Sequence, residues 1–78
     1  MKYKESFKKE CILIGKNIKR FREARKMTIK ELSINTGIRV SYLKKIEAGI
    51  AYGMYLDKHL IKIANALTVK ISELFYRK

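Results

Sequence analysis

Residues 28–49, TIKELSINTGIRVSYLKKIEAG, constrain the fold of this chain more than any other stretch. Thr28 stands just before a helical pattern, and Glu31 lies three residues after Thr28. This arrangement is known as a capping box. The capping box predicts a helix over residues 29–35. Gly37 comes soon after, and glycine most readily adopts the left-handed conformation found just past a helix end. The first half of the stretch therefore predicts a short helix followed by a tight turn.

The second half predicts another short helix, which begins near Arg39 or Val40 and ends at Ala48, before Gly49. The side chains expected to face the core are Leu32, Ile38, Leu43 and Ile46, and Ser33 is small enough for close packing. Two helices joined by a short turn that contains glycine cross at a wide angle. In DNA-binding proteins the second helix of such a pair enters the major groove.

The N-terminal third of the chain has helical periodicity. Its apolar residues recur every three or four positions, at Tyr3, Phe7, Cys11, Ile14, Ile18 and Phe21. Gly15 weakens the pattern, so two interpretations stay open: one long helix, or a short arm followed by a helix from about Leu13 to Lys26. We prefer the second. The chain is divided into an N-terminal arm or helix extension over residues 1–13 and a helix-turn-helix DNA-binding domain over residues 14–78.

The C-terminal part predicts two further helices. Asp57 is placed to cap a fourth helix, whose core face is Leu60, Ile63, Ala64 and Leu67. A short fifth helix is expected from Ser72 to Tyr76, with Ile71, Leu74 and Phe75 turned inward. The chain holds no Pro and only four Gly, which favours helices joined by short turns. The sequence therefore predicts one compact all-α domain of five helices.

The charge of the chain points to a polyanionic partner. The formal net charge is +12, from 19 Lys and Arg against seven Asp and Glu in 78 residues. Such a surplus attracts polyanions, and double-stranded DNA is the partner that we expect. A basic helix on a membrane surface is the main competitor. It is disfavoured because the capped turns indicate a globular fold, and no stretch approaches the roughly 20 apolar residues of a spanning helix.

Residue types that other functions need are scarce. The single Cys, Cys11, has no disulfide partner within the chain, and the N-terminus lacks a signal-peptide pattern, so a cytoplasmic location is expected. One His and one Cys do not form a zinc site, and His59 lies alone among polar positions of a helix. The sequence shows no nucleophile–base pair, metal cluster or phosphate loop, so neither an enzyme nor a cofactor is expected.

Residues 14–75 resemble the helix-turn-helix domain of the Cro and lambda-repressor family, also called the Xre family. The matching residues are Ile14, Gly15, Ile18, Phe21, Arg22, Thr28, Glu31, Leu32, Ser33, Gly37, Ile38, Leu43, Ile46, Glu47, Gly49, Leu60, Ile63, Ala64, Leu67, Val69 and Leu74. The resemblance implies a five-helix DNA-binding domain, usually a dimer on a two-fold-symmetric operator and usually a transcriptional regulator.

The resemblance also implies the residues that contact bases, which are Arg39, Val40, Ser41, Lys44 and Lys45. Their chemistry suits this role: Arg39 can make a bidentate contact to guanine, and Val40 can pack on a thymine methyl group. Ser41 can donate to a base or to a phosphate. Lys44 and Lys45 can reach guanine acceptors or phosphates, and the pattern leaves both alternatives open.

Phosphate contacts are expected from the start of the first short helix. The backbone N–H groups of Ile29 and Lys30 can bind a phosphate at the positive end of the helix dipole. The Thr28 hydroxyl can join them, although capping alone explains that residue. Tyr42 can donate its hydroxyl to a phosphate or can cover the edge of the core. The resemblance implies one structural pair besides, a salt bridge between Arg22 and Glu47 that orients the DNA-reading helix.

The chain departs from the family after Gly49, where the loop is apolar and lacks the usual Pro. An exposed apolar cluster suggests an interface, so we expect Tyr52, Met54, Tyr55 and Leu56 to form the dimer contact. The alternative is that these side chains fold back over the core. The segment 1–13 also departs from the family. It can pack on the domain, pack on a second subunit or add phosphate contacts.

The function expected is a sequence-specific transcriptional regulator, most simply a repressor, that acts as a homodimer. The pattern shows no segment for a small-molecule effector, so concentration, dimerisation or a protein partner would regulate it. The alternative is an antitoxin-like or controller protein whose main role is to bind a protein partner through the apolar 50–56 loop or the N-terminal arm.

Overall fold

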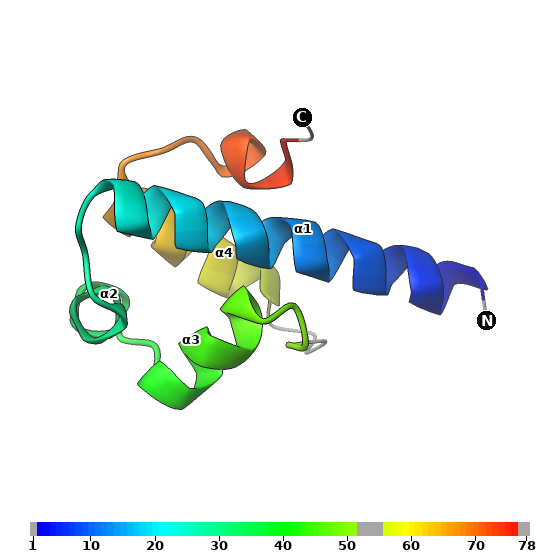
Figure 1. Ribbon diagram of the computed structural model, residues 1–78, viewed down its shortest axis with the longest axis horizontal. Coiled ribbons are helices and arrows are strands. Elements are labelled where there is room, and N and C mark those ends of the chain that lie inside the picture. Colours follow the sequence, from blue (N-terminus) through cyan, green and yellow to red (C-terminus); the bar gives the residue numbers. More distant parts are fainter. Residues whose placement is uncertain (1, 52–55, 77–78) are drawn as a thin grey trace.

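The computed structural model of the protein describes residues 2–51 and 56–76, with side chains described over residues 8–51 and 58–76. The described elements are four α-helices and one short 3-10 helix, shown in Figure 1: α1 (Lys2–Ala24), α2 (Ile29–Thr36), α3 (Val40–Glu47), α4 (Leu56–Leu67) and η1 (Ile71–Phe75). Helix α1 runs along the molecule, with α2 and α3 on one side of it and η1 on the other (Figure 1). The all-α class is confirmed.

Helix α1 is a single helix of 23 residues. The preferred interpretation, an arm followed by a helix from about Leu13, is therefore wrong for the secondary structure. The helix continues through this point because Cys11 and Ile14, on either side of it, are both buried in the same core. It ends at Ala24, since Lys26 adopts a positive φ of 53°. The domain boundary at residue 13 stays a prediction.

The expectation of a fifth α-helix is also wrong, because η1 is a 3-10 helix of five residues. Its start is closed by the Glu73 carboxylate, which accepts a hydrogen bond of 2.8 Å from the Lys70 N–H. Of its side chains only Leu74 is buried in the core. Ile71 and Phe75, both expected to face inward, are 40% and 42% exposed.

The core of the described residues contains most of the apolar side chains expected to face it, together with Ala51, which was not predicted. The buried members are Cys11, Ile14, Ile18, Leu32, Ile38, Leu43, Ile46, Ala51, Leu60, Ile63, Ala64, Leu67 and Leu74. Phe21, Met27 and Tyr42 are partly buried and pack against them. Two described polar residues, Asn17 and Thr36, are buried as well, and Asn17 donates hydrogen bonds to the carbonyl oxygens of Leu74 (2.8 Å) and Tyr76 (3.0 Å). Asn17 thereby attaches the C-terminal turn to α1.

Helices α1 and α3 approach each other closely at Gly15. A Cβ atom at Gly15 would lie 2.7 Å from the Glu47 carbonyl oxygen and would also meet the carbonyl oxygen of Ile46. These are backbone atoms, which cannot rotate away as a flexible side chain does. Gly15 therefore lets the C-terminal end of α3 rest directly on α1.

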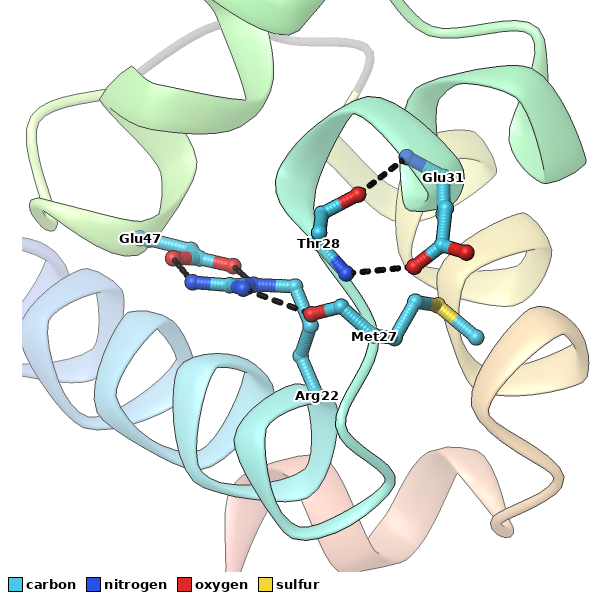
Figure 2. Close-up of polar contacts among 5 residues, drawn as sticks. All are labelled: Arg22, Met27, Thr28, Glu31 and Glu47. Atoms are coloured by element: carbon cyan, nitrogen blue, oxygen red, sulfur yellow. Dashed lines mark hydrogen bonds and ion pairs between the residues drawn. The ribbon is translucent and has the colours of Figure 1, made fainter.

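An ion pair joins the same two helices further along α1 (Figure 2). The Arg22 guanidinium donates two hydrogen bonds to Glu47, Nε to Oε2 at 2.7 Å and Nη2 to Oε1 at 3.0 Å. Its Nη1 donates to the Met27 carbonyl oxygen at 2.8 Å, which ties the chain leading to α2 to the same group. The hydrogen bond with Glu47 is the main reason that the pKa of Arg22 is raised above its ordinary value. Bidentate geometry of this kind fixes orientation as well as distance.

Replacing Gly15 by Ala tests the close approach. Alanine favours a helix over glycine by about 1 kcal/mol, whereas forcing a methyl group against backbone costs about 1 to 3 kcal/mol. We expect the steric term to dominate and Gly15→Ala to lower the melting temperature by about 5 °C or more, read by circular dichroism. Lys16→Ala, at the exposed neighbouring position, is the control and should change it little. A Gly15→Ala protein as stable as the wild type would contradict the contact.

Replacing Glu47 by Ala tests the ion pair. The side chains of Arg22 and Glu47 are only 13% and 8% exposed, so the change leaves a nearly buried guanidinium without its carboxylate. We expect a loss of about 3 kcal/mol in the free energy of unfolding, measured in urea. Glu23→Ala removes an exposed carboxylate from the same helix as Arg22 and should cost less than about 0.5 kcal/mol. Equal free energies of unfolding for the two variants would show that the Arg22–Glu47 pair does not stabilise the fold.

Candidate nucleic-acid interface

The first short helix begins with the expected cap. The Thr28 hydroxyl accepts a hydrogen bond of 3.0 Å from the Glu31 N–H, and the Glu31 carboxylate accepts one of 2.8 Å from the Thr28 N–H (Figure 2). The capping box is confirmed. The N–H groups of Ile29 and Lys30 belong to the first helical turn, where backbone donors have no partner within the helix. Lys30 is exposed beside them, so the start of α2 suits an anion.

The turn between α2 and α3 is fixed by backbone conformation and by side chains. Gly37 has φ 75° and ψ 10°, the left-handed conformation expected of it. The Thr36 hydroxyl donates to the Leu32 carbonyl oxygen at 2.8 Å and accepts from the Ile38 N–H at 3.1 Å. The Ser33 hydroxyl donates to the Ile38 carbonyl oxygen. These hydrogen bonds connect the last turn of α2 to the residue that leads into α3.

This network was not predicted from the sequence. Ser33 was expected only to allow close packing, and no hydrogen bond was assigned to Thr36. A signal was present, because Ser and Thr in the last turn of a helix often bond to the backbone one turn earlier. Because of this network, several hydrogen bonds, and not Gly37 alone, set the direction of α3 relative to α2.

Helix α3 presents one polar face to solvent. Leu43 and Ile46 are buried against the core, while Ser41, Lys44 and Lys45 are exposed on the opposite side. Arg39 is exposed at the N-cap position, immediately before the helix. Val40 is half-buried at one edge of this face. The structure therefore brings the five expected base-contacting residues together on one short helix and its N-cap, with Val40 the least accessible.

Tyr42 lies at the other edge of α3, half-buried against the core. Its ring packs edge-on against the ring of His59 from α4, with centroids 4.9 Å apart and an interplanar angle of 61°. The sequence interpretation left His59 alone on a polar surface, and this contact was missed. No local pattern signals it, because the two residues lie on different helices.

The exposed face of α3 is positively charged. Arg39, Lys44 and Lys45 contribute cations, and the first turn of the helix has no acidic residue. The one carboxylate of α3, Glu47, is held by Arg22 on the far side. Lys44 and Lys45 also lie in the last turn of the helix, where positive charges interact favourably with the helix dipole. The face can accept a polyanion without an opposing charge on the same helix.

The residues expected at the dimer contact are not placed by the structure. Tyr52, Met54 and Tyr55 lie outside the described residues, and Leu56 begins α4 without a described side chain. Ile50, just before them, is exposed, and Ala51 is buried. The dimer contact stays a prediction.

Other site chemistry is sparse in the described part of the chain. Within residues 8–51 and 58–76, no three His, Cys, Asp or Glu side chains gather as metal ligands would. Cys11 is buried, and this burial together with the charge of Glu10 raises the pKa of its thiol. No described helix combines the length and apolar character needed to span a bilayer.

Comparisons with known proteins agree with this geometry. A family model described as the Cro/C1-type HTH DNA-binding domain matches residues 17–78. The chain is 33% identical over 63 residues to the HTH-type transcriptional regulator SlrR of Bacillus subtilis (strain 168), an alignment that covers 81% of this chain and 41% of the relative. The chain thus spans less than half the length of that relative. No solved structure gives a significant match. The chain belongs to the Cro/C1-type helix-turn-helix family of DNA-binding domains.

Proposed function

We propose that this protein is a sequence-specific transcriptional regulator that reads double-stranded DNA with α3. The observation that carries the proposal is the exposed face formed by Arg39, Ser41, Lys44 and Lys45 on a helix whose orientation is fixed at both ends. The α2–α3 turn fixes the position of the N-terminal end of α3, and the Arg22–Glu47 pair fixes the position of its C-terminal end. A short helix held in this way can place side chains against base edges in the major groove.

The residues divide by the chemistry that each brings to DNA. Arg39, at the N-cap of α3, would donate two hydrogen bonds to a guanine, and Ser41, two residues later, is exposed on the same helix. The N–H groups at the start of α2 bind a backbone phosphate and fix the register of the protein on the duplex. The net charge of +12 adds sequence-independent attraction that salt weakens. Binding, and not catalysis, is the activity proposed.

We further propose that the protein acts as a homodimer in the cytoplasm. Two subunits would place their α3 helices in successive major grooves, about one helical turn apart, and the operator would be two-fold symmetric. Such a dimer on a promoter blocks polymerase, which makes repression the simplest outcome. The name of the relative SlrR, a transcriptional regulator, supports regulation, and neither a cofactor nor an effector is required.

Selection of bound duplexes from a random DNA library tests sequence reading. We expect a palindrome to be enriched, and its affinity to exceed that of an unrelated duplex by about 10³-fold or more at physiological salt. Titration with salt separates charge from sequence, because attraction by charge alone weakens equally for both duplexes. Equal, steeply salt-dependent binding to every duplex would overturn the proposal. Binding would then rest on charge alone.

Replacing Arg39 by Ala tests direct readout at the start of α3. We expect the selected duplex to bind about 10- to 100-fold more weakly, and the preference at one base pair of each half-site to disappear. Lys70→Ala removes one exposed cation just before η1, the element that lies on the opposite side of α1 from α3 (Figure 1), and is the control for charge. It should weaken all duplexes slightly and leave the selected sequence unchanged. An identical selected sequence for Arg39→Ala would exclude base contact by Arg39.

A further inference from the structure

A hollow of about 470 Å³ lies beside α3, on the side that faces α4. Its wall includes Arg39, Ser41, Tyr42 and Lys45 from α3 and its N-cap, and His59 from α4. We call it the α3–α4 hollow. It shares Arg39, Ser41 and Lys45 with the exposed face of α3, so the hollow and the proposed base-reading surface are continuous.

The chemistry of the hollow suits an anion. Arg39 and Lys45 supply two positive charges, and Ser41 and Tyr42 supply two hydroxyl groups that can donate hydrogen bonds. No Asp or Glu is among the described residues that line it. Cations and neutral donors around one concavity favour a phosphate group, which offers several strong acceptor oxygens.

His59 has a feature that packing within the chain does not explain. The ring is half-buried against Tyr42, and its Nδ1 atom is shielded from solvent without a hydrogen-bond partner. A buried polar atom without a partner carries a cost. Because Nδ1 is shielded, Nε2 is the ring nitrogen that His59 can offer to a ligand, as a donor when it carries the proton.

The register of α3 separates its two lysines. Ser41 and Lys45 are four residues apart and lie on the same side of the helix, the side that lines the hollow. Lys44 is one position away and is not part of the wall. The two adjacent lysines, which the sequence did not distinguish, therefore face different surroundings. Lys45 faces the hollow and Lys44 faces the open side of α3.

We propose that the α3–α4 hollow binds one phosphate of the DNA backbone, held by the Lys45 ammonium, the Tyr42 hydroxyl and the His59 imidazole. The assignment rests on the proposed function, because it is the DNA on the adjoining face of α3 that would bring the phosphate to the hollow. It adds His59 to the DNA-contacting residues and gives Lys45 a phosphate in place of a base. A phosphate fixed at this edge sets the depth and register of α3 in the groove.

A scan of the selected duplex with single methylphosphonates tests the assignment. Each methylphosphonate replaces one charged phosphate oxygen by a methyl group and so removes one backbone contact. For the wild type, we expect a loss of about tenfold at one phosphate in each half-site, in addition to the losses from other backbone contacts. His59→Phe keeps an aromatic ring against Tyr42 but removes both nitrogens. It should bind the unmodified duplex about three- to tenfold more weakly and lose less than the wild type at that one phosphate, because Lys45 and Tyr42 still contact it.

Two more variants separate the contact from folding and from charge. Tyr42→Phe keeps the ring and removes only the hydroxyl, so it should reduce the loss at the same phosphate. Lys62→Ala removes an exposed cation from α4 that does not line the hollow, and it should keep the full wild-type loss there. Thermal melts of all variants check that each one folds.

Three results would overturn the assignment. If the wild type reads a palindrome but His59→Phe and Tyr42→Phe keep its affinity and its methylphosphonate profile, the hollow binds no backbone phosphate and the proposed function stands. If inorganic phosphate at matched ionic strength displaces the duplex from the wild type but not from His59→Phe, and no position of the scan depends on His59, the hollow binds free phosphate. If the wild type prefers no duplex, the proposed function fails first and this assignment fails with it.

Discussion

The contact between α1 and α3 is the constraint on which the rest of the structure depends. Two features create it: the missing side chain of Gly15, which lets the backbone of α3 approach, and the bidentate Arg22–Glu47 pair. Because Arg22 also donates to the Met27 carbonyl oxygen, the same guanidinium holds the chain that enters α2. Packing of apolar side chains tolerates small rotations of a helix, whereas a two-point hydrogen-bonded contact does not. Polar contacts therefore fix the direction of α3, in addition to the packing of the apolar core.

These contacts explain how a helix of eight residues can be held in one orientation, as the proposed DNA recognition requires. A helix of this length has little stability of its own, and tertiary contacts supply it. Leu43 and Ile46 supply the apolar part, the Thr36 and Ser33 hydroxyls fix the turn before it, and Glu47 fixes its end. The outward side then needs no structural residue, which leaves it available for Ser41 and the cations. The structural role and the proposed DNA-contacting role are thus divided between the two sides of one helix.

Local features of the structure were predictable from the sequence, and contacts between distant segments were not. The Thr28–Glu31 cap and the conformation of Gly37 follow from rules that involve a few neighbouring residues. The exposed side of α3 follows from helical periodicity. Gly15, in contrast, is an unfavourable residue for a helix when only its neighbours in sequence are considered. Its role in allowing close packing becomes clear only when the backbone of α3 lies against it. The continuity of α1 was misjudged for the same reason.

Asn17 did carry a signal, since it shares a helical face with buried Ile14 and Ile18, but its acceptors lie 57 and 59 residues away. The edge-on packing of Tyr42 on His59 joins two helices across a loop, so no sequence rule predicts it.

The structure of the protein bound to its selected duplex would test the proposed function most directly. We expect α3 to lie in the major groove with Arg39 and Ser41 at base edges, and the Arg22–Glu47 distances to stay at 2.7 and 3.0 Å, because the orientation exists before binding. A duplex bound along the basic surface of α1, with α3 outside the groove, would contradict it. So would a bound form in which the Arg22–Glu47 pair is broken and α3 has turned to reach the bases.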